Sequence, residues 1–247
     1  MARPSTLSTP TPAAPALWRR LVAELLGTAL LLAIVVGSGI SAERLAGGNV
    51  ALALLANAVA TGAGLIVLIL LFGPLSGAHF NPAVTVMEAA RGALPRIEAV
   101  AYLFAQTAGA VGGVVVAHAM YDLAPLAAST HARAGTGQLT SEVVATFGLL
   151  LTILGIGRSR AALVPYAVGL YIAAAYWFTA SSSFANPAVT LARALTPTFA
   201  GIRPGDVPGF IGAQIAGAAL AGLAYRALWP PVPRSLSPDL APDPELG

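Results

Sequence analysis

The five-residue sequence Asn-Pro-Ala-Val-Thr occurs twice in this chain, each time between long apolar segments. The first copy spans Asn81–Thr85 and the second spans Asn186–Thr190, 105 positions later. Such identical polar segments at matching places indicate an internal duplication. They also limit the possible folds, because irregular backbone within an apolar environment survives only where protein or water satisfies its polar groups.

The composition identifies that environment as a membrane. Hydrophobic residues make up 57% of the 247 residues, charged residues only 9%, and the mean hydropathy is +0.78. A soluble domain is about a quarter charged, so this chain cannot cover a water-facing surface. There is no cysteine, which excludes a disulfide scaffold and thiolate metal sites. The thirteen basic residues are all arginines and are scattered, so a nucleic-acid partner is not expected.

Six segments are long and apolar enough to cross a bilayer, which takes about 20 residues each. They are Leu21–Ile40, Val50–Phe72, Ile97–Met120, Ser141–Gly157, Ala161–Ala180 and Val207–Leu228. A signal peptide is the rival interpretation of the first segment, because Arg19 and Arg20 precede it, but the segment is too long for one. We expect one membrane domain over residues 17–229, with disordered tails at 1–16 and 230–247.

Further similarities support the duplication and define its halves as about 17–121 and 136–229. Ala23–Leu32 matches Ser141–Leu150, and Tyr102–Ala110 matches Phe210–Ala218. These matches place Glu24 opposite Glu142, and Gln106 opposite Gln214. Because each half contains three spans, the two halves are predicted to lie inverted in the membrane.

The arginines predict the orientation of the chain. Cytoplasmic loops carry an excess of basic residues, and with both termini in the cytoplasm nine arginines lie on that side and four on the other. The nine are Arg3, Arg19, Arg20, Arg91, Arg96, Arg158, Arg160, Arg226 and Arg234, and the four are Arg44, Arg133, Arg193 and Arg203. The Arg-rich, Lys-free composition suggests a bacterial inner membrane.

Each Asn-Pro pair is typical of the start of a short helix. Asparagine is a favoured N-cap and proline a favoured first residue, so half-helices are expected at Pro82–Arg91 and Pro187–Leu195. In inverted halves their starts meet near the midplane, each with about half a positive charge. Such a site repels cations and offers amide donors to neutral solutes.

These residues resemble the aquaporin (major intrinsic protein) family from about Leu21 to Leu228. Ser76–Thr85 is similar to the first signature loop of that family, and the buried glutamates and glutamines match its buried polar positions. The resemblance implies an all-α fold of six transmembrane helices and two re-entrant half-helices, a pore in each subunit, and a homotetramer in the lipid bilayer. It implies a pore lined by both motifs, and no cofactor or metal. The motif residues are Asn81, Pro82, Ala83, Asn186, Pro187 and Ala188.

The chain departs from the family after the second motif, where most members have an arginine and this chain has Val189. Family spacing places the other filter residues at Thr61, Ala174 and Ser183, and a slip on the fifth span would bring in Ala173 or Tyr176 instead. Small, uncharged side chains predict a wide filter that passes glycerol, urea or the neutral hydroxides of arsenic and antimony. The pattern resembles a bacterial branch associated with arsenite. Cation exclusion would then depend mainly on the two asparagines.

Several other residues have two interpretations each. Glu24, Glu142, Gln106 and Gln214 are expected to support the re-entrant loops by hydrogen bonds, although carboxylates inside a membrane also suggest a proton relay. His79 lines the inner pore or is a core histidine. Arg193, whose inverted counterpart is Glu88, either carries its charge into the outer vestibule or is a solvated or salt-bridged residue at a helix end.

The function predicted from these features is a passive channel for small uncharged solutes. The alternative is an ion-coupled secondary transporter, since inverted repeats with broken helices occur there too, and a junctional or scaffolding role ranks last. Three dispersed histidines do not make a metal site, and no histidine matches Ser181, Ser182 or Ser183 for hydrolysis. No catalytic residue is therefore expected.

Overall fold

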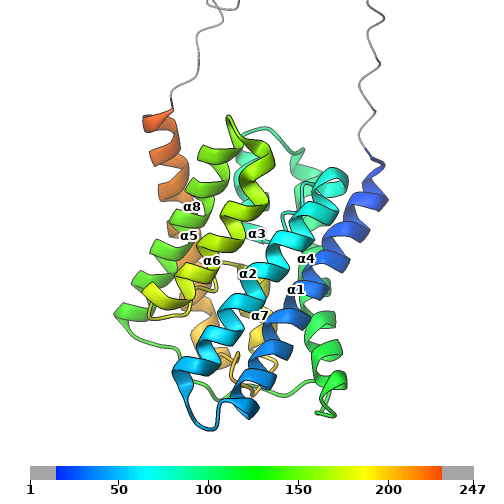
Figure 1. Ribbon diagram of the computed structural model, residues 1–247. Coiled ribbons are helices and arrows are strands. Elements are labelled where there is room, and N and C mark those ends of the chain that lie inside the picture. The colour runs from blue at the N-terminus through cyan, green and yellow to red at the C-terminus, as the bar shows by residue number, and fades with distance from the viewer. Residues whose placement is uncertain (1–14, 230–247) are drawn as a thin grey trace, which may run out of the picture.

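The computed structural model describes residues 15–229, and within this range it contains six long helices that surround two short ones (Figure 1). All six long helices are apolar enough to cross a membrane, and no strand occurs among the described residues. The long helices are α1 (Leu17–Leu45), α2 (Val50–Ser76), α4 (Arg96–Met120), α5 (Thr136–Gly157), α6 (Val164–Phe178, preceded by the 3-10 turn Ala161–Leu163) and α8 (Val207–Leu228, preceded by the 3-10 turn Pro204–Asp206). The predicted all-α membrane fold is confirmed. The predicted tails lie outside the described residues, except for residues 15 and 16.

Helix α1 extends beyond the predicted segment Leu21–Ile40 at both ends. The apolar run marks only the part expected in the hydrocarbon core, whereas the helical backbone continues into charged residues such as Arg19 and Glu43. The fifth span is shorter than predicted, because α6 ends at Phe178 rather than Ala180. The half-helices α3 (Pro82–Ala90) and α7 (Pro187–Arg193) begin as predicted and end one and two residues early.

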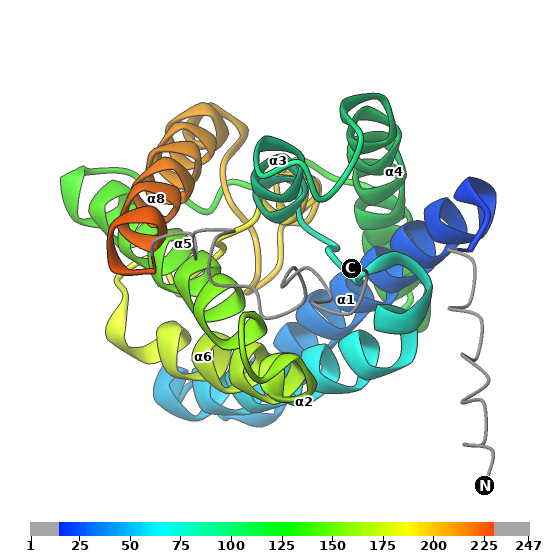
Figure 2. The same ribbon diagram turned by 90° about the horizontal axis from the view of Figure 1, so that it is seen from above.

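The helices form two matching sets. In the first half α1 packs against α2 and α4, and in the second half α5 packs against α6 and α8. The halves meet where α2 crosses α6, and each half-helix packs against a long helix of the other half, α3 on α8 and α7 on α4. Figure 2 shows α2 beside α6, and α3 between α8 and α4. Helix α1 begins and α8 ends at one end of the bundle, here called the terminal side (Figure 1). The opposite end is called the far side.

Glycines allow the helix backbones to approach closely. At the crossing of α2 and α6, a Cβ on Gly62 would lie 2.7 Å from the carbonyl oxygen of Gly169. On α4, a Cβ at Gly109 would lie 3.0 Å from the carbonyl carbon of Leu25 and closer still to its oxygen. These obstacles are backbone atoms, which cannot rotate away as a side chain can.

Replacement of Gly109 with valine is therefore expected to destabilise the bundle. Overpacking costs about 1–3 kcal/mol, and here α4 would have to move away from α1. Thermal unfolding in detergent would measure the loss. Gly112→Val is the matched control on the same helix, because nothing lies within 4 Å of its Cβ position. Equal unfolding temperatures for the two variants would contradict the close packing of α1 and α4.

Candidate pore

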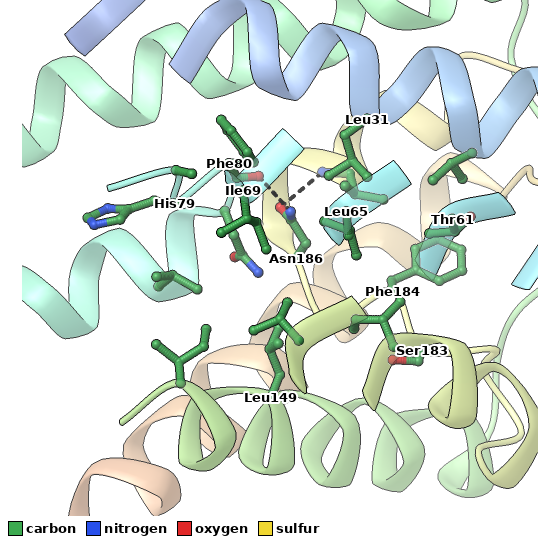
Figure 3. Close-up of a pocket in the computed structure, with 18 of the residues that line it drawn as sticks. Leu31, Thr61, Leu65, Ile69, His79, Phe80, Leu149, Ser183, Phe184 and Asn186 are labelled. Carbon is green, nitrogen blue, oxygen red and sulfur yellow. Dashed lines mark hydrogen bonds between the residues drawn. The ribbon is translucent and has the colours of Figure 1, made fainter. Parts of the chain in front are cut away.

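The two Asn-Pro-Ala motifs meet inside the bundle and bind each other. The Nδ2 of Asn81 donates to the carbonyl of Ala185 at 2.8 Å. The Nδ2 of Asn186 donates to the carbonyl of Phe80 at 2.8 Å, a bond that Figure 3 shows. The Oδ1 of each asparagine accepts the backbone N–H two residues later, that of Ala83 at 2.9 Å and that of Ala188 at 3.0 Å. Each asparagine therefore caps its own half-helix and ties it to the opposite loop.

The backbone before each motif is turned into the left-handed region. Ala78 and Phe80 have φ values of 49° and 48°, and the corresponding residues Ser183 and Ala185 both have 49°. This conformation is uncommon for residues other than glycine and costs about 1–3 kcal/mol each. In this conformation the carbonyl groups of Phe80 and Ala185 accept hydrogen bonds from the asparagine of the opposite motif.

Glu24 holds the first loop in this conformation. Its Oε1 accepts the hydroxyl of Ser76 at 2.7 Å and the N–H of His79 at 2.9 Å, and its Oε2 accepts the N–H of Phe80 at 2.7 Å. The amide of Gln106 also donates to Oε2 at 2.8 Å. Glu24 and Gln106 are fully buried. The carboxylate thus supplies the acceptors that the irregular backbone needs away from water.

Glu142 does the same for the second loop. It accepts the N–H groups of Phe184 and Ala185, each at 2.9 Å, and the amide of Gln214 at 2.6 Å. The amide of Gln214 also donates to the hydroxyl of Thr190 at 2.8 Å. Both oxygens of each carboxylate are therefore occupied by loop or amide donors, which favours loop support over a proton relay.

A cavity of about 310 Å³ runs alongside the motifs. Its lining includes both motif asparagines, Asn81 and Asn186. Figure 3 shows His79 towards one end, Asn186 in the middle, and Thr61 and Ser183 towards the other end. Most of the remaining wall is aliphatic, with residues such as Leu31, Leu65, Ile69, Leu149 and Ile172. The motif amides therefore lie beside a largely apolar conduit rather than in dry packing.

Three of the four predicted filter residues line this cavity, and the fourth does not. Thr61, Ser183 and Val189 belong to the lining, whereas Ala174 is exposed on the outside of α6. The lining residue there is Tyr176, whose hydroxyl lies 3.2 Å from that of Thr61. Two positions on a helix differ by about 200°, so Ala174 lies on the outer face, and the alternative reached by a slip of two residues, Tyr176, lies on the inner face. We call Thr61, Tyr176, Ser183 and Val189 the hydroxyl ring.

Tyr176 also changes the predicted chemistry of the ring. A wide ring of small residues was expected, but one member is a bulky phenol and three of the four carry hydroxyl groups. The Oγ of Ser183 is buried and has no hydrogen-bond partner among residues 15–229. An unpaired buried hydroxyl beside a cavity is available to a passing solute that carries oxygen or nitrogen.

Arg193 also lines the cavity, contrary to the interpretation of a solvated residue at a helix end. It is 2% exposed. Its Nε donates to the carbonyl of Ala200, and its guanidinium lies 3.4 Å from the centre of the Phe184 ring. Of the two interpretations of Arg193, the geometry favours the one in which its charge lies at the far-side end of the pore.

The sequence identifies Arg133 only as a charge in an outer loop, but in the structure its side chain holds two backbone segments on the far side together. Its guanidinium donates to the carbonyls of Gly201 at 2.8 Å and Ser181 at 3.1 Å. Partial burial and the positive charges of Arg133 and Arg193 lower the pKa of His131. Positive charge at this mouth therefore comes from guanidinium groups rather than from the imidazole.

The terminal-side end of the cavity contains His79 and Glu88. The Nδ1 of His79 lies 3.0 Å from the hydroxyl of Thr85, and its ring packs against Tyr102. The carboxylate of Glu88 pairs with Arg91 at 2.9 Å. His79 thus combines both predicted roles, since it packs against the protein core and lines the cavity. Among the described residues, no three His, Asp or Glu side chains are grouped as a metal site would need.

Comparisons with known proteins agree with this geometry. The sequence profile described as "Major intrinsic protein" matches residues 12–178. The chain is 56% identical to aquaglyceroporin AqpS of Rhizobium meliloti (strain 1021), over 92% of this chain and 98% of that protein. It is 30% identical to aquaporin Z of Rhodopseudomonas palustris, over 85% of this chain and 92% of that protein.

A solved structure shows the same fold. The X-ray structure of the aquaglyceroporin from Plasmodium falciparum superposes with a TM-score of 0.62, covering 87% of this chain and 96% of that chain. The sequence identity is 20%, so this likeness concerns the fold alone.

Proposed function

We propose that this chain, which belongs to the major intrinsic protein family, carries the neutral trihydroxides of arsenic and antimony. As a member of that family it is a passive channel for small solutes such as glycerol. The printed name of the relative from Rhizobium meliloti describes an aquaglyceroporin. Glycerol and the two trihydroxides each carry three hydroxyl groups and no charge, so one ring can accommodate all of them.

The hydroxyl ring is the observation that carries this proposal. Thr61, Tyr176 and Ser183 offer hydroxyl groups that donate or accept, and Val189 supplies an apolar, compact wall. A solute with three hydroxyl groups replaces its water shell with these partners while its remaining surface contacts aliphatic side chains. The Oγ of Ser183, which has no hydrogen-bond partner within the part of the chain that the structure describes, gives the ring a further hydrogen-bonding group.

The alternative of an ion-coupled carrier is not favoured. Coupling would require an ionisable group at the midplane that exchanges ions during transport. Glu24 and Glu142 are the candidates, but their oxygens accept hydrogen bonds from the loops that form the pore. Binding a proton or sodium ion there would break those bonds.

Uptake by liposomes that contain the purified protein tests the cargo. We expect rapid swelling with glycerol and rapid entry of arsenite and antimonite, each with a low activation energy and without any ion gradient. Water, urea and hydrogen peroxide complete the panel and rank the cargo. Flux that saturates and vanishes without a proton or sodium gradient would instead support a carrier. Glycerol flux without arsenite or antimonite flux would refute the metalloid part of the proposal.

We also propose a homotetramer in a bacterial inner membrane, with both termini in the cytoplasm. Large apolar side chains such as Phe104 and Trp177 are exposed on the outside of the bundle, ready to contact lipid or neighbouring subunits. The arginine distribution supports the orientation. Native mass spectrometry would measure the subunit number, and reporter fusions at each terminus would measure the orientation.

A further inference from the structure

The far-side end of the cavity contains a positive charge that no carboxylate among the described residues neutralises. Arg193 lines the cavity and is 2% exposed, and no carboxylate among residues 15–229 forms an ion pair with it. Glu142, the buried carboxylate of the same repeat, is occupied by its loop donors. A buried charge acts over several ångströms with less screening than a charge in bulk solvent.

The guanidinium of Arg193 is fixed at one side and unbonded at the other. Its Nε donates to the carbonyl of Ala200, and the ring of Phe184 stacks on its face. Within residues 15–229, neither of its terminal NH₂ groups has a hydrogen-bond partner. Arg133 differs, because its Nε and both terminal nitrogens donate to backbone carbonyls. Arg133 therefore acts as a brace, whereas Arg193 retains free donors.

The position of Arg193 explains how its charge reaches the pore. It lies four residues after Val189 on α7, so the two side chains occupy the same face, one turn apart. Side chains on a helix lean towards its N-terminus, and the N-terminus of α7 is Asn186, at the cavity. A long side chain from the next turn thus leans back towards the hydroxyl ring.

The two mouths differ in charge although they occupy equivalent positions. Glu88 and Arg193 each lie seven residues after the asparagine of their motif and each line the cavity. Glu88 is paired with Arg91, so the terminal-side mouth is largely neutralised. Arg193 remains unpaired among the described residues, so the far-side mouth is electropositive.

We propose that Arg193 is the cation barrier of this channel and also a hydrogen-bond donor to passing solutes. The inference rests on the proposed channel function. A monovalent cation about 5 Å from this charge, at an effective dielectric constant of about 20, would partition into the pore about 300-fold less. A neutral solute experiences no such repulsion and gains two donors instead.

The absence of cysteine from the chain allows a direct test. Arg193→Cys removes the charge and introduces a single thiol, to which a methanethiosulfonate reagent can attach a positively charged aminoethyl group or a neutral methyl group. Liposomes report potassium and proton flux with ion-sensitive dyes, and glycerol flux by swelling. We expect cation flux relative to glycerol flux to rise at least about tenfold in Arg193→Cys. The charged reagent should reverse this rise and the neutral reagent should not.

Arg203→Gln is the matched control. Arg203 follows Arg193 by ten residues but is exposed and paired with Asp206 outside the cavity, so its replacement should leave cation flux unchanged. Arg193→Lys keeps the charge and should keep cation exclusion, and it carries the test if Arg193→Cys does not fold. Leakage of cations through Arg193→Lys, or cation exclusion by uncharged Arg193→Cys, would overturn the proposal. Failure of the unmodified protein to pass glycerol would instead refute the channel function itself.

Discussion

Replacement of Glu142 with leucine is expected to unfold the second re-entrant loop and abolish solute flux. The carboxylate accepts the N–H groups of Phe184 and Ala185 and the amide of Gln214. Each buried donor left without an acceptor costs about 1–3 kcal/mol, so the variant should lose at least about 3 kcal/mol of stability. Glu142→Gln keeps one acceptor oxygen and should lose less.

Thermal unfolding in detergent and glycerol-driven swelling of liposomes would measure the two effects together. Glu43→Leu is the control, since Glu43 is an exposed glutamate near the end of α1 and its replacement should change neither quantity. If Glu142→Leu unfolded at the temperature of the unmodified protein and still passed glycerol, the loop would not depend on this carboxylate.

Replacement of Val189 with arginine should nearly close the pore to glycerol and arsenite. The cavity has a volume of only about 310 Å³ over its whole length, and a guanidinium at position 189 would occupy the ring beside Tyr176. It would also add a second positive charge next to Arg193, which favours hydration of the ring. We expect glycerol and arsenite flux to fall at least about tenfold, equivalent to about 1.4 kcal/mol in the barrier, and water flux to fall less.

Two further variants separate size from charge. Val189→Thr has nearly the same shape and should retain glycerol flux, and Val189→Leu adds volume without charge and should lie between valine and arginine. Stopped-flow swelling measures water and glycerol, and uptake assays measure arsenite. Unchanged glycerol and arsenite flux in Val189→Arg would place position 189 away from the narrowest part of the pore.

The fold was accessible from the sequence because its determinants are local and repeated. Apolar runs of sufficient length define the six spans, Asn-Pro defines each half-helix start, and an odd number of spans per half defines the inversion. The internal similarity of the two halves shows that Glu24 and Glu142 occupy equivalent positions, as do Gln106 and Gln214. Each of these features can be recognised from residues adjacent in the sequence or from the similarity of the two halves, without knowledge of any tertiary contact.

The pore chemistry was less accessible, because it depends on which face of a helix meets the cavity. Tyr176 rather than Ala174 lines the hydroxyl ring, and an error of two residues moves a side chain about 200° around the helix. Val189 predicted a ring without arginine at that position, and the sequence left open whether Arg193 reaches the pore from the next turn. In both cases the sequence offered the lining residue as one of several alternatives but did not identify the inward face.

The primary structure alone thus determined the membrane environment, the inverted duplication and the two capped half-helices. Tertiary structure alone decided which side chains surround the conduit and which charges there stay unpaired. The physical reason is that hydropathy and capping act along a few neighbouring residues, whereas the lining of a cavity depends on helix rotation and on long side chains. The bond between Thr61 and Tyr176, for example, joins residues 115 positions apart, whose proximity no local pattern encodes.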